Sequence, residues 1–285
     1  MSDQSPTVQM QQVFESHAAT ALRLRGSTAN ERIEKIRKLR DAVIAHTEDW
    51  YQAAYADFKK PAGEVDLAEI LPICLEANAA IRNLKKWMKP QKVWPTLLTL
   101  GTSSYVQSMP RGRCLIIGPF NYPVNLTLGP LISAIAAGNT VVMKPSEVSA
   151  ETSALLAQLV PKYLDTSAVA LVEGSVPETT ALLDQHFNHI FYTGNGTVGR
   201  IVMAAAAKNL TPVTLELGGK SPVIVDSAEE IHAAIGPAAG WTGSGNLPDA
   251  VAGDEDRRLQ REKAQQEKRG KAESQATDPA AHLTR

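Results

Sequence analysis

Glu216 is the carboxylate of this chain whose neighbours most clearly suggest chemistry. It ends an apolar run within residues 210–225 that predicts a strand, and it stands just before Gly218 and Gly219. A carboxylate at the carboxyl end of a strand occupies the position where open α/β sheets bind their ligands. Burial beside apolar neighbours would raise its pKa toward the range of a general base. The alternative is a solvated glutamate at the mouth of a turn, and one Glu beside two glycines does not decide between them.

A glycine-rich sequence at residues 194–199 fits the pattern G-x-G-x-x-G between a predicted strand and a predicted helix. In that context the backbone N–H groups can approach a pyrophosphate at the helix N-terminus. The alternative is a glycine-rich turn that serves packing, and the pattern usually follows the first strand of its unit, whereas here it follows several. Glu216 also lies near the spacing at which an acid would hold a ribose hydroxyl. The pattern therefore leaves two roles open for Glu216, ribose ligand or base.

Three further polar residues follow predicted strands. Lys144 and Glu147 belong to a Lys-Pro-Ser-Glu sequence, where an ammonium and a carboxylate could bind ribose hydroxyls, or could form an ordinary loop salt bridge of little energetic weight. Asn121 lies in a loop framed by Gly and Pro, where its amide could donate to an oxyanion or serve the geometry of a turn. His186 and His189 lack further partners at metal-ligand spacing, so no metal site is expected.

Composition narrows the class of protein. The 285 residues are enough for one large or two ordinary domains. The 29 Lys and Arg residues are balanced by 30 Asp and Glu residues, which argues against nucleic-acid or membrane-surface binding. The polar N-terminus lacks the apolar core of a signal peptide, and the most apolar region, residues 114–143, is interrupted by Gly, Pro and Asn. Two cysteines suit a reducing compartment, so we expect a soluble, cytoplasmic α/β protein.

The first 113 residues predict helices followed by a hairpin. Apolar spacing predicts helices over residues 6–25, 28–55 and 65–88, the second of them with a capping box of Thr28 and Glu31. The helically spaced apolar residues of the first helix are Val8, Val13, Ala18 and Leu22, and those expected to face inward from the third are Ile70, Ile73, Leu75, Ala79 and Ile81. Residues 93–110 carry Gly-Thr-Ser-Ser between two β-favouring runs, which predicts a hairpin. Trp87 and Trp94 are expected in the core.

From residue 114 onward, short strands alternate with helices. The predicted strands are residues 114–117, 140–143, 168–172, 189–192 and 213–215. The first helix between them ends near residue 137, and the others span residues 149–163, 178–185 and 197–209. This alternation predicts an α/β fold with a Rossmann-like, doubly wound parallel sheet. We place the N-terminal helices and the hairpin in residues 1–113 and a Rossmann-like, nucleotide-binding region in residues 114–231. Residues 232–285 are rich first in Gly and Pro and then in charge, which predicts a disordered, charged C-terminal tail.

Four segments in this order resemble the aldehyde dehydrogenase superfamily, and most of all its class 3 branch. They are Gly118-Pro-Phe-Asn-Tyr-Pro123, Lys144-Pro-Ser-Glu147, Phe191-Tyr-Thr-Gly-Asn-Gly-Thr-Val-Gly199 and Leu215-Glu-Leu-Gly-Gly-Lys220. The resemblance covers residues 8–231 and implies oxidation of an aldehyde to a carboxylic acid with NAD, or with NADP. By that resemblance Asn121 would be the oxyanion donor and Glu216 the base that activates water.

The resemblance also implies which residues contact the cofactor. Lys144 and Glu147 would hold the adenosine ribose. The other cofactor-binding residues would be Gly194, Asn195, Gly196, Thr197, Val198, Gly199, Leu217 and Gly218. The hairpin of residues 93–110 would belong to the element through which members of the family form homodimers.

The sequence departs from the family in its cysteines. The family mechanism needs a cysteine thiolate roughly thirty residues beyond the base, in a Gly-Gln-Thr-Cys sequence. Here no Cys follows Glu216, and Cys74 and Cys114 read as buried small hydrophobes. We therefore expect a chain truncated before the catalytic cysteine, with little or no dehydrogenase activity and no assured homodimer. Two alternatives are a non-catalytic nucleotide-binding or subunit-interaction protein, and a frameshifted product of a full-length enzyme.

Overall fold

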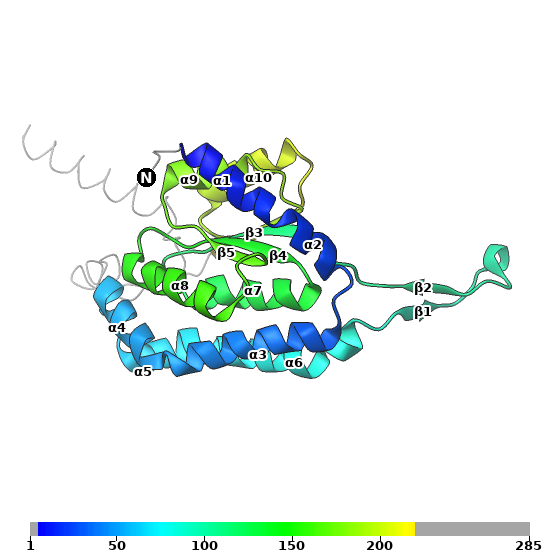
Figure 1. The fold of residues 1–285 in the computed structure, drawn as a ribbon, viewed down its shortest axis with the longest axis horizontal. Helices are drawn as coiled ribbons and strands as arrows, with labels where there is room; N and C mark the ends of the chain where they lie inside the picture. Colours follow the sequence, from blue (N-terminus) through cyan, green and yellow to red (C-terminus); the bar gives the residue numbers. More distant parts are fainter. Residues whose placement is uncertain (1–4, 220–285) are drawn as a thin grey trace, which may run out of the picture.

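A computed structural model describes residues 5–219, and its centre is a sheet of five parallel strands in the order β5-β4-β3-β6-β7 (Figure 1). The strands are β3 (Arg113–Ile117), β4 (Thr140–Lys144), β5 (Val169–Leu171), β6 (His189–Gly194) and β7 (Val213–Leu217). The chain runs from β3 outward through β4 to β5, then returns to the other side of β3 at β6 and continues to β7. This order confirms the Rossmann-like, doubly wound α/β fold that the alternation of strands and helices predicted.

The central strand β3 is buried on both faces. Cys114 and Ile116 belong to the hydrophobic cluster on one side of the sheet, and Leu115 and Ile117 belong to the cluster on the other. A strand covered on both faces reads as a continuous apolar run, as this one does, because every side chain meets a core. β3 pairs along its length with β4 and along most of it with β6, so the three strands end at the same edge.

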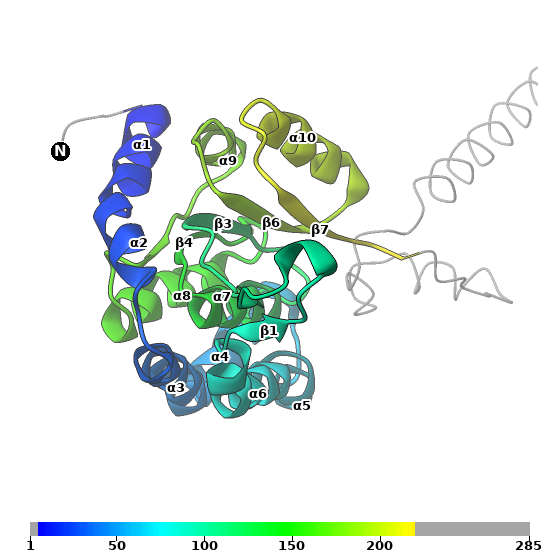
Figure 2. The same cartoon turned by 90° about the vertical axis from the view of Figure 1, so that its right-hand side faces the viewer.

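Helices cover both faces of the sheet (Figures 1 and 2). One face packs against α1 (Pro6–Ser16), α9 (Val176–Leu183) and α10 (Gly196–Ala207). The other face packs against α7 (Asn125–Ala137) and α8 (Ala150–Tyr163). Outside these lies a layer made of α3 (Ala29–Ala45), α4 (Thr47–Phe58), α5 (Ala62–Val65), the π-helical segment η1 (Asp66–Ile70) and α6 (Leu71–Trp87). The short helix α2 (Ala18–Leu24) connects α1 to this layer.

Helix α7 is buried on two sides because it lies between the sheet and the layer of α3 and α6. Leu128, Leu131 and Ile132 are at most 2% exposed. A helix that is apolar around most of its circumference is the type that such a position requires. The helix ends as the sequence predicted, at Gly138, whose φ of 85° is left-handed. The buried guanidinium of Arg32 donates to the carbonyl oxygen of Ala136 at 3.0 Å and satisfies part of this helix end.

The predicted N-terminal helices are present, but each is interrupted. The first breaks at His17 and the second at His46. The capping box that opens the second is confirmed, since Glu31 N donates to Thr28 Oγ1 at 3.3 Å and Thr28 N donates to Glu31 Oε2 at 2.5 Å. In the first helix the spacing indicated the wrong face, because Val8 and Leu22 are exposed and the buried residues are instead Met10, Phe14, Thr20, Ala21 and Leu24.

The third predicted helix is a composite of α5, η1 and α6. Its inward face on α6 carries Ile73, Ala77, Ala80 and Leu84. Leu75 was also expected on that face, but this prediction is wrong, because Leu75 is 60% exposed. Two residues along an α-helix turn about 200°, so Leu75 points away from the side that Ile73 occupies.

The predicted hairpin is confirmed, with shorter strands than expected. β1 (Gln91–Val93) and β2 (Ser104–Val106) pair antiparallel, and the hairpin extends away from the body of the molecule (Figure 1). Trp94 is 91% exposed and Trp87 is 50% exposed, so their predicted core positions are wrong. An aromatic side chain is buried only where the backbone places it against a core, and this hairpin extends away from the core.

Residues on both sides of position 113 contribute to one hydrophobic cluster. Ile36 and Ile73 come from the N-terminal helices, Leu131 and Ile132 come from α7, and all four are fully buried in it. The division into 1–113 and 114–231 remains a prediction, and the residues beyond 219, with the predicted tail 232–285, lie outside the described part of the chain. Among the helices of residues 5–219, none combines the length and apolar character that a membrane crossing requires.

His17 should make stability depend on pH. Its side chain is 1% exposed, and burial lowers its pKa below the ordinary value of 6.5. Below pH 6.5 the unfolded chain therefore takes up this proton more readily than the folded chain, so the free energy of unfolding falls as the pH falls. We expect His17→Gln to reduce the difference in unfolding free energy between pH 7.5 and pH 5.5, as measured by urea titration. The exposed His186 provides the control, and an equal pH dependence in wild type, His17→Gln and His186→Gln would contradict the assignment.

Candidate active site at the carboxyl edge of the sheet

The predicted site residues lie at the carboxyl ends of strands, or after those ends, along one edge of the sheet. In the ladder Ile117 lies opposite both Lys144 and Tyr192, and Thr193 lies opposite Glu216. The N–H of Gly118 donates to the carbonyl oxygen of Lys144 at 3.0 Å, which ties the loop after β3 to the end of β4. The strand order reverses between β3 and β6, and such switch points are where open α/β sheets bind ligands.

Lys144 and Glu147 form a close ion pair in the loop after β4. The Lys144 side chain is 3% exposed, and its Nζ lies 2.6 Å from Glu147 Oε2. Glu147 is 48% exposed, and burial, the largest single influence, acts to raise its pKa. The hydrogen bond from Lys144, a backbone hydrogen bond and the charge of Lys144 together outweigh it and hold the pKa below its usual value. The half-exposed carboxylate is an acceptor that a ligand with hydroxyl groups can reach, and the buried ammonium beside it is a donor.

The glycine-rich sequence of residues 194–199 forms the strand-to-helix turn that its pattern predicted. β6 ends at Gly194, Asn195 is the N-cap of α10, and the Asn195 side chain accepts a hydrogen bond from Val198 N at 2.9 Å. The turn therefore leads into the N-terminus of a twelve-residue helix, where free N–H groups favour anions. Gly199 also has a packing role, because a Cβ there would lie 3.0 Å from a Leu217 methyl group.

Asn121 lies in the loop after β3 and is 7% exposed. Within residues 5–219 its side-chain oxygen has no hydrogen-bond partner. An asparagine that serves turn geometry would use this oxygen to accept a bond from a nearby backbone N–H. The Asn121 oxygen therefore does not make the bond by which an asparagine stabilises a turn.

Glu216 is solvent-exposed at the end of β7. The sequence left a buried and a solvated carboxylate both open at this position, and Glu216 is exposed in the described part of the chain. The reason is that β7 is the last strand in the sheet order, and the residues before Glu216, from Val213 to Leu215, are only half-buried. Leu217 beside it is 46% exposed, and Gly218 is half-buried.

Neither cysteine resembles a nucleophile. Cys114 is buried in β3, and desolvation raises its pKa to about 12. Cys74 is half-buried on α6, and burial raises its pKa as well. A thiol needs a low pKa and access to react, so neither environment favours a reactive thiolate. Cys114 is buried as predicted, whereas Cys74, also predicted buried, is only half-buried. No cluster of three or more metal-binding side chains occurs within residues 5–219. The Nε2 atom of His189 is hydrogen-bonded to Thr214 Oγ1 at 3.1 Å.

The sequence reading missed two charged residues beside the site, Lys60 and Glu69. Both are buried, at 7% and 1% exposure, and they contact the loop that carries Asn121. A signal for Glu69 was available, because it precedes Ile73 by four residues and so lies on the inward face of the same helical stretch. A carboxylate on an inward face is uncommon enough to mark a polar interaction.

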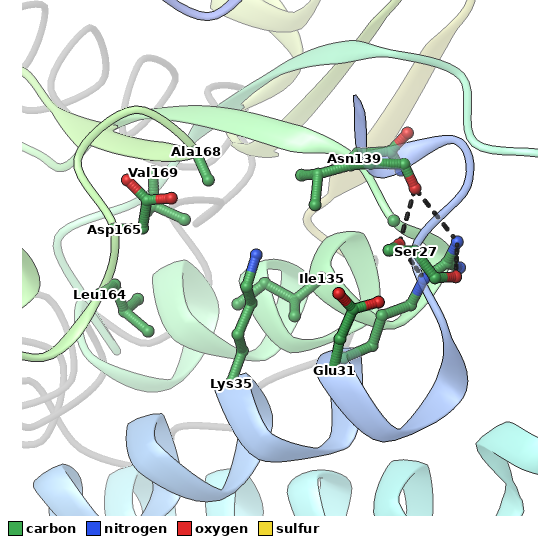
Figure 3. Close-up of a pocket in the computed structure, with 12 residues that line it drawn as sticks. Ser27, Glu31, Lys35, Ile135, Asn139, Leu164, Asp165, Ala168 and Val169 are labelled. Carbon is green, nitrogen blue, oxygen red and sulfur yellow. Dashed lines mark hydrogen bonds between the residues drawn. The ribbon is translucent and has the colours of Figure 1, made fainter. Parts of the chain in front are cut away.

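A cavity between α3, α7 and the loop before β5 lies away from these residues (Figure 3). Its lining includes Glu31, Lys35, Asn139, Asp165 and Val169. Asn139 directly precedes β4, and Val169 begins β5, so the cavity lies at the amino ends of the strands. It is therefore at the opposite edge of the sheet from the candidate active site.

The fold and the site define a Rossmann-like α/β protein with a polar site at the carboxyl edge of its sheet. Comparison with known proteins is more specific. Residues 4–242 match the family described as the aldehyde dehydrogenase family. An aldehyde dehydrogenase of Craterostigma plantagineum is 47% identical over 215 residues, which cover 75% of this chain and 45% of that protein. Aldehyde dehydrogenase family 3 member B1 of Bos taurus is 52% identical over 175 residues, which cover 61% of this chain and 37% of the relative.

Solved structures agree with the sequence relatives. The AldH of Staphylococcus aureus in a substrate-bound state superposes with a TM-score of 0.73 at 39% identity, over 76% of this chain and 47% of that one. A Mycobacterium tuberculosis aldehyde dehydrogenase complexed with NAD+ has the same fold, with a TM-score of 0.69 at 22% identity over 75% of this chain and 44% of its own. The chain belongs to the aldehyde dehydrogenase family, with class 3 members among its relatives, and it spans less than half the length of these relatives.

Gly118 should be intolerant of a side chain, because the loop at the candidate site packs closely on α7. A Cβ at this position would overlap Thr127 Oγ1 and lie 3.3 Å from Thr127 Cβ, and Thr127 is fully buried. We expect Gly118→Ala to lower the free energy of unfolding by about 1–3 kcal/mol, the usual cost of overpacking. Adding Thr127→Ala should recover part of this loss, because it removes the group that clashes.

The control for this prediction is Gly63→Ala, since a Cβ at Gly63 would meet no atom within 4 Å. In a helix, this change should leave stability unchanged or raise it by up to about 1 kcal/mol. Urea unfolding of the four proteins measures both effects. A Gly118→Ala protein as stable as Gly63→Ala would show that the loop is looser than its contacts indicate.

Proposed function

We propose that residues 5–219 form the dinucleotide-binding part of an NAD(P)-dependent aldehyde dehydrogenase, an enzyme that oxidises an aldehyde to a carboxylic acid. The observation that carries the proposal is the meeting, at one sheet edge, of the Lys144–Glu147 pair with the turn of residues 194–199. A bound dinucleotide supplies the acceptor for the hydride that leaves the aldehyde carbon. Because the chain spans less than half of its relatives, the activity of a whole enzyme is part of the proposal.

Each side chain has a role in this proposal. Lys144 donates to the hydroxyl groups of the adenosine ribose, and Glu147 accepts from them. The turn residues Gly194, Asn195, Gly196, Thr197, Val198 and Gly199 border the pyrophosphate, and Leu217 and Gly218 complete the cofactor site from β7. The donor set fits the group, because hydroxyls match the paired charges and phosphates match a helix N-terminus. A carboxylate at the ribose favours NAD over NADP, whose extra phosphate it would repel.

Asn121 and Glu216 are assigned to the aldehyde chemistry. The Asn121 amide donates to the oxyanion that forms when a thiolate adds to the aldehyde carbon. The donor in this role is the side-chain N–H group, and the side-chain oxygen accepts no hydrogen bond within residues 5–219 that would tie the amide to its own loop. Glu216, at the end of β7, takes a proton from the water that later hydrolyses the thioester. Its exposure in residues 5–219 leaves it accessible to such a water.

The covalent step needs a thiolate that the two cysteines do not supply. Cys74 lies on α6 and Cys114 lies inside β3, and burial raises the pKa of both thiols. We therefore assign to the 285-residue polypeptide the binding of the dinucleotide and not the turnover of aldehyde.

A second candidate function is subunit interaction, favoured by the exposed apolar hairpin. The side chains on and beside it that are more than 60% exposed are Trp94, Leu97, Leu98, Leu100, Tyr105, Val106 and Met109. Exposed apolar surface of this kind is typical of protein interfaces. The two functions are compatible, since the hairpin extends away from the sheet edge that carries the candidate site (Figures 1 and 2).

NAD+ binding should depend on the Lys144–Glu147 pair. We expect isothermal titration calorimetry to show that the 285-residue chain binds NAD+. Lys144→Met should raise the dissociation constant by about tenfold or more, because it removes a charge-assisted hydrogen bond. Glu147→Gln keeps an acceptor oxygen and should have a smaller effect. Lys208→Met is the matched control, because Lys208 is an exposed lysine 3.9 Å from Asp184. A folded wild-type chain that does not bind NAD+ or NADP+ at millimolar concentration would refute the proposed function.

Aldehyde turnover should be absent from the same polypeptide. Deleting a catalytic nucleophile typically costs several orders of magnitude in rate, so we expect no NADH formation above background with aliphatic or aromatic aldehydes. An active aldehyde dehydrogenase assayed in parallel shows that the substrates and cofactor are competent. If NADH does form, Cys74→Ser and Cys114→Ser identify whether either thiol is responsible, and that result would overturn the assignment of both as inert.

A further inference from the structure

A buried ion pair lies beside the loop that carries Asn121. Lys60 is 7% exposed and Glu69 is 1% exposed, and Lys60 Nζ lies 3.3 Å from Glu69 Oε1. Lys60 follows helix α4, and Glu69 belongs to the π-helical segment η1, so the two charges come from neighbouring parts of the outer helical layer. Neither residue belongs to the four segments that resemble the family.

Both members of the pair bind the stretch of chain between β3 and α7. Lys60 Nζ donates to the backbone oxygen of Asn121 and lies 4.4 Å from the centroid of the Tyr122 ring. Glu69 Oε2 accepts a hydrogen bond from Asn125 N, the first residue of α7, at 2.8 Å. The carbonyl oxygen of Ala68, next to Glu69, accepts from the Asn125 side chain at 3.1 Å. The pair thus holds the loop at Asn121 and again at Asn125, four residues later.

Stability alone is a poor explanation for such a pair. Transferring two charges out of water costs several kcal/mol per ion, and well-packed apolar residues often serve as well or better. Burial also raises the pKa of Glu69, even though the hydrogen bond from Asn125 N and the charge of Lys60 act to lower it. π-Helical turns occur frequently at functional sites, and this one carries the buried carboxylate. A charged pair bonded to the backbone of one loop fixes where that loop lies.

We propose that Lys60 and Glu69 are positioning residues, which set the location of the Asn121 amide through the backbone of its loop. The proposal rests on the proposed function in one respect, since it is the role of Asn121 at an oxyanion that gives its position catalytic meaning. The two residues do not touch the reacting atoms themselves.

The physical basis is the number of restraints on a short loop. Lys60 restrains the Asn121 carbonyl, and Glu69 restrains the amide that begins α7. With both in place, the Asn121 side chain projects from a backbone held at its own carbonyl and again four residues later. The backbone can therefore orient a side chain whose oxygen accepts no hydrogen bond within residues 5–219. Preorganised donors of this kind are what oxyanion stabilisation requires.

The test compares backbone and side-chain dynamics in three variants of the 285-residue chain. Lys60→Met removes the charge at similar length, and Glu69→Gln keeps an acceptor for Asn125 N while removing the negative charge. Glu76→Gln is the matched control, because Glu76 also lies on the helix facing α7 and accepts from Ser133 Oγ at 2.9 Å, yet it does not contact the loop. Amide hydrogen exchange and the side-chain NH2 signals of Asn121, assigned by their loss in Asn121→Ala, are measured by NMR.

We expect Lys60→Met to speed amide exchange in residues 121–126 by about tenfold or more. It should also shift or broaden the Asn121 NH2 signals. Exchange in residues 189–217 should change by less than about twofold. Glu69→Gln should act in the same direction with a smaller effect, and it carries the test if Lys60→Met does not fold. Loop exchange and Asn121 signals equal to those of Glu76→Gln, or exchange that rises equally throughout the chain, would overturn the proposal.

A parallel NAD+ titration keeps this inference separate from the proposed function. If the wild-type chain does not bind NAD+, the proposed function fails, whereas the exchange and NH2 signals still decide whether Lys60 and Glu69 position Asn121. If NAD+ binds and the loop is insensitive to both substitutions, the proposed function stands and the positioning role is wrong.

Discussion

The parallel pairing of β3 with β4 and β6 is the constraint on which the candidate site depends. Because the strands run in the same direction and in register, each delivers its following loop to one edge of the sheet. The strand order reverses at β3, so the loop after β3 and the loop after β6 leave adjacent strands at the switch point of the sheet. Asn121 and the turn of residues 194–199 belong to these two loops, although more than seventy residues separate them in sequence.

Helix α7 transmits that constraint to the outer helical layer. It contacts the sheet on one side and α3 and α6 on the other, so packing against both layers fixes the position of the helix. Gly118 lets the loop after β3 approach Thr127 in the first turns of α7, and Glu69 binds the first amide of the same helix. The loop that carries Asn121 is therefore held by the sheet before it, by the helix after it and by the outer layer beside it.

The two buried lysines near the site have different surroundings. Lys144 pairs with a carboxylate that is 48% exposed, so solvent and ligands can compete for that pair. Lys60 pairs with a carboxylate that is 1% exposed and bonds to the backbone, so its partners are fixed. An accessible pair suits recognition of hydroxyl groups, and an enclosed pair suits the positioning of a loop, because hydrogen bonds closed off from water are both stronger and less exchangeable.

Local sequence determined the features that depend on neighbours within one or two turns of the chain. The strands from β3 to β7, the capping box of Thr28 and the end of α7 at Gly138 follow from apolar runs, a side-chain cap and a left-handed glycine. The resemblance to the aldehyde dehydrogenase family was also visible in the sequence, because its segments are short and contiguous, and the comparisons confirm it.

Only the tertiary structure decided what depends on distant contacts. Within residues 5–219, Glu216 is exposed because β7 is the outer strand of the described sheet, and Trp94 is exposed because its hairpin extends away from the core. Lys60 and Glu69 become partners through the fold of the outer layer. Lys60 contacts Asn121 and Glu69 contacts Asn125, each across more than fifty residues of sequence. Burial and charge pairing are properties of the whole packing arrangement, so no local pattern of residue types specifies them.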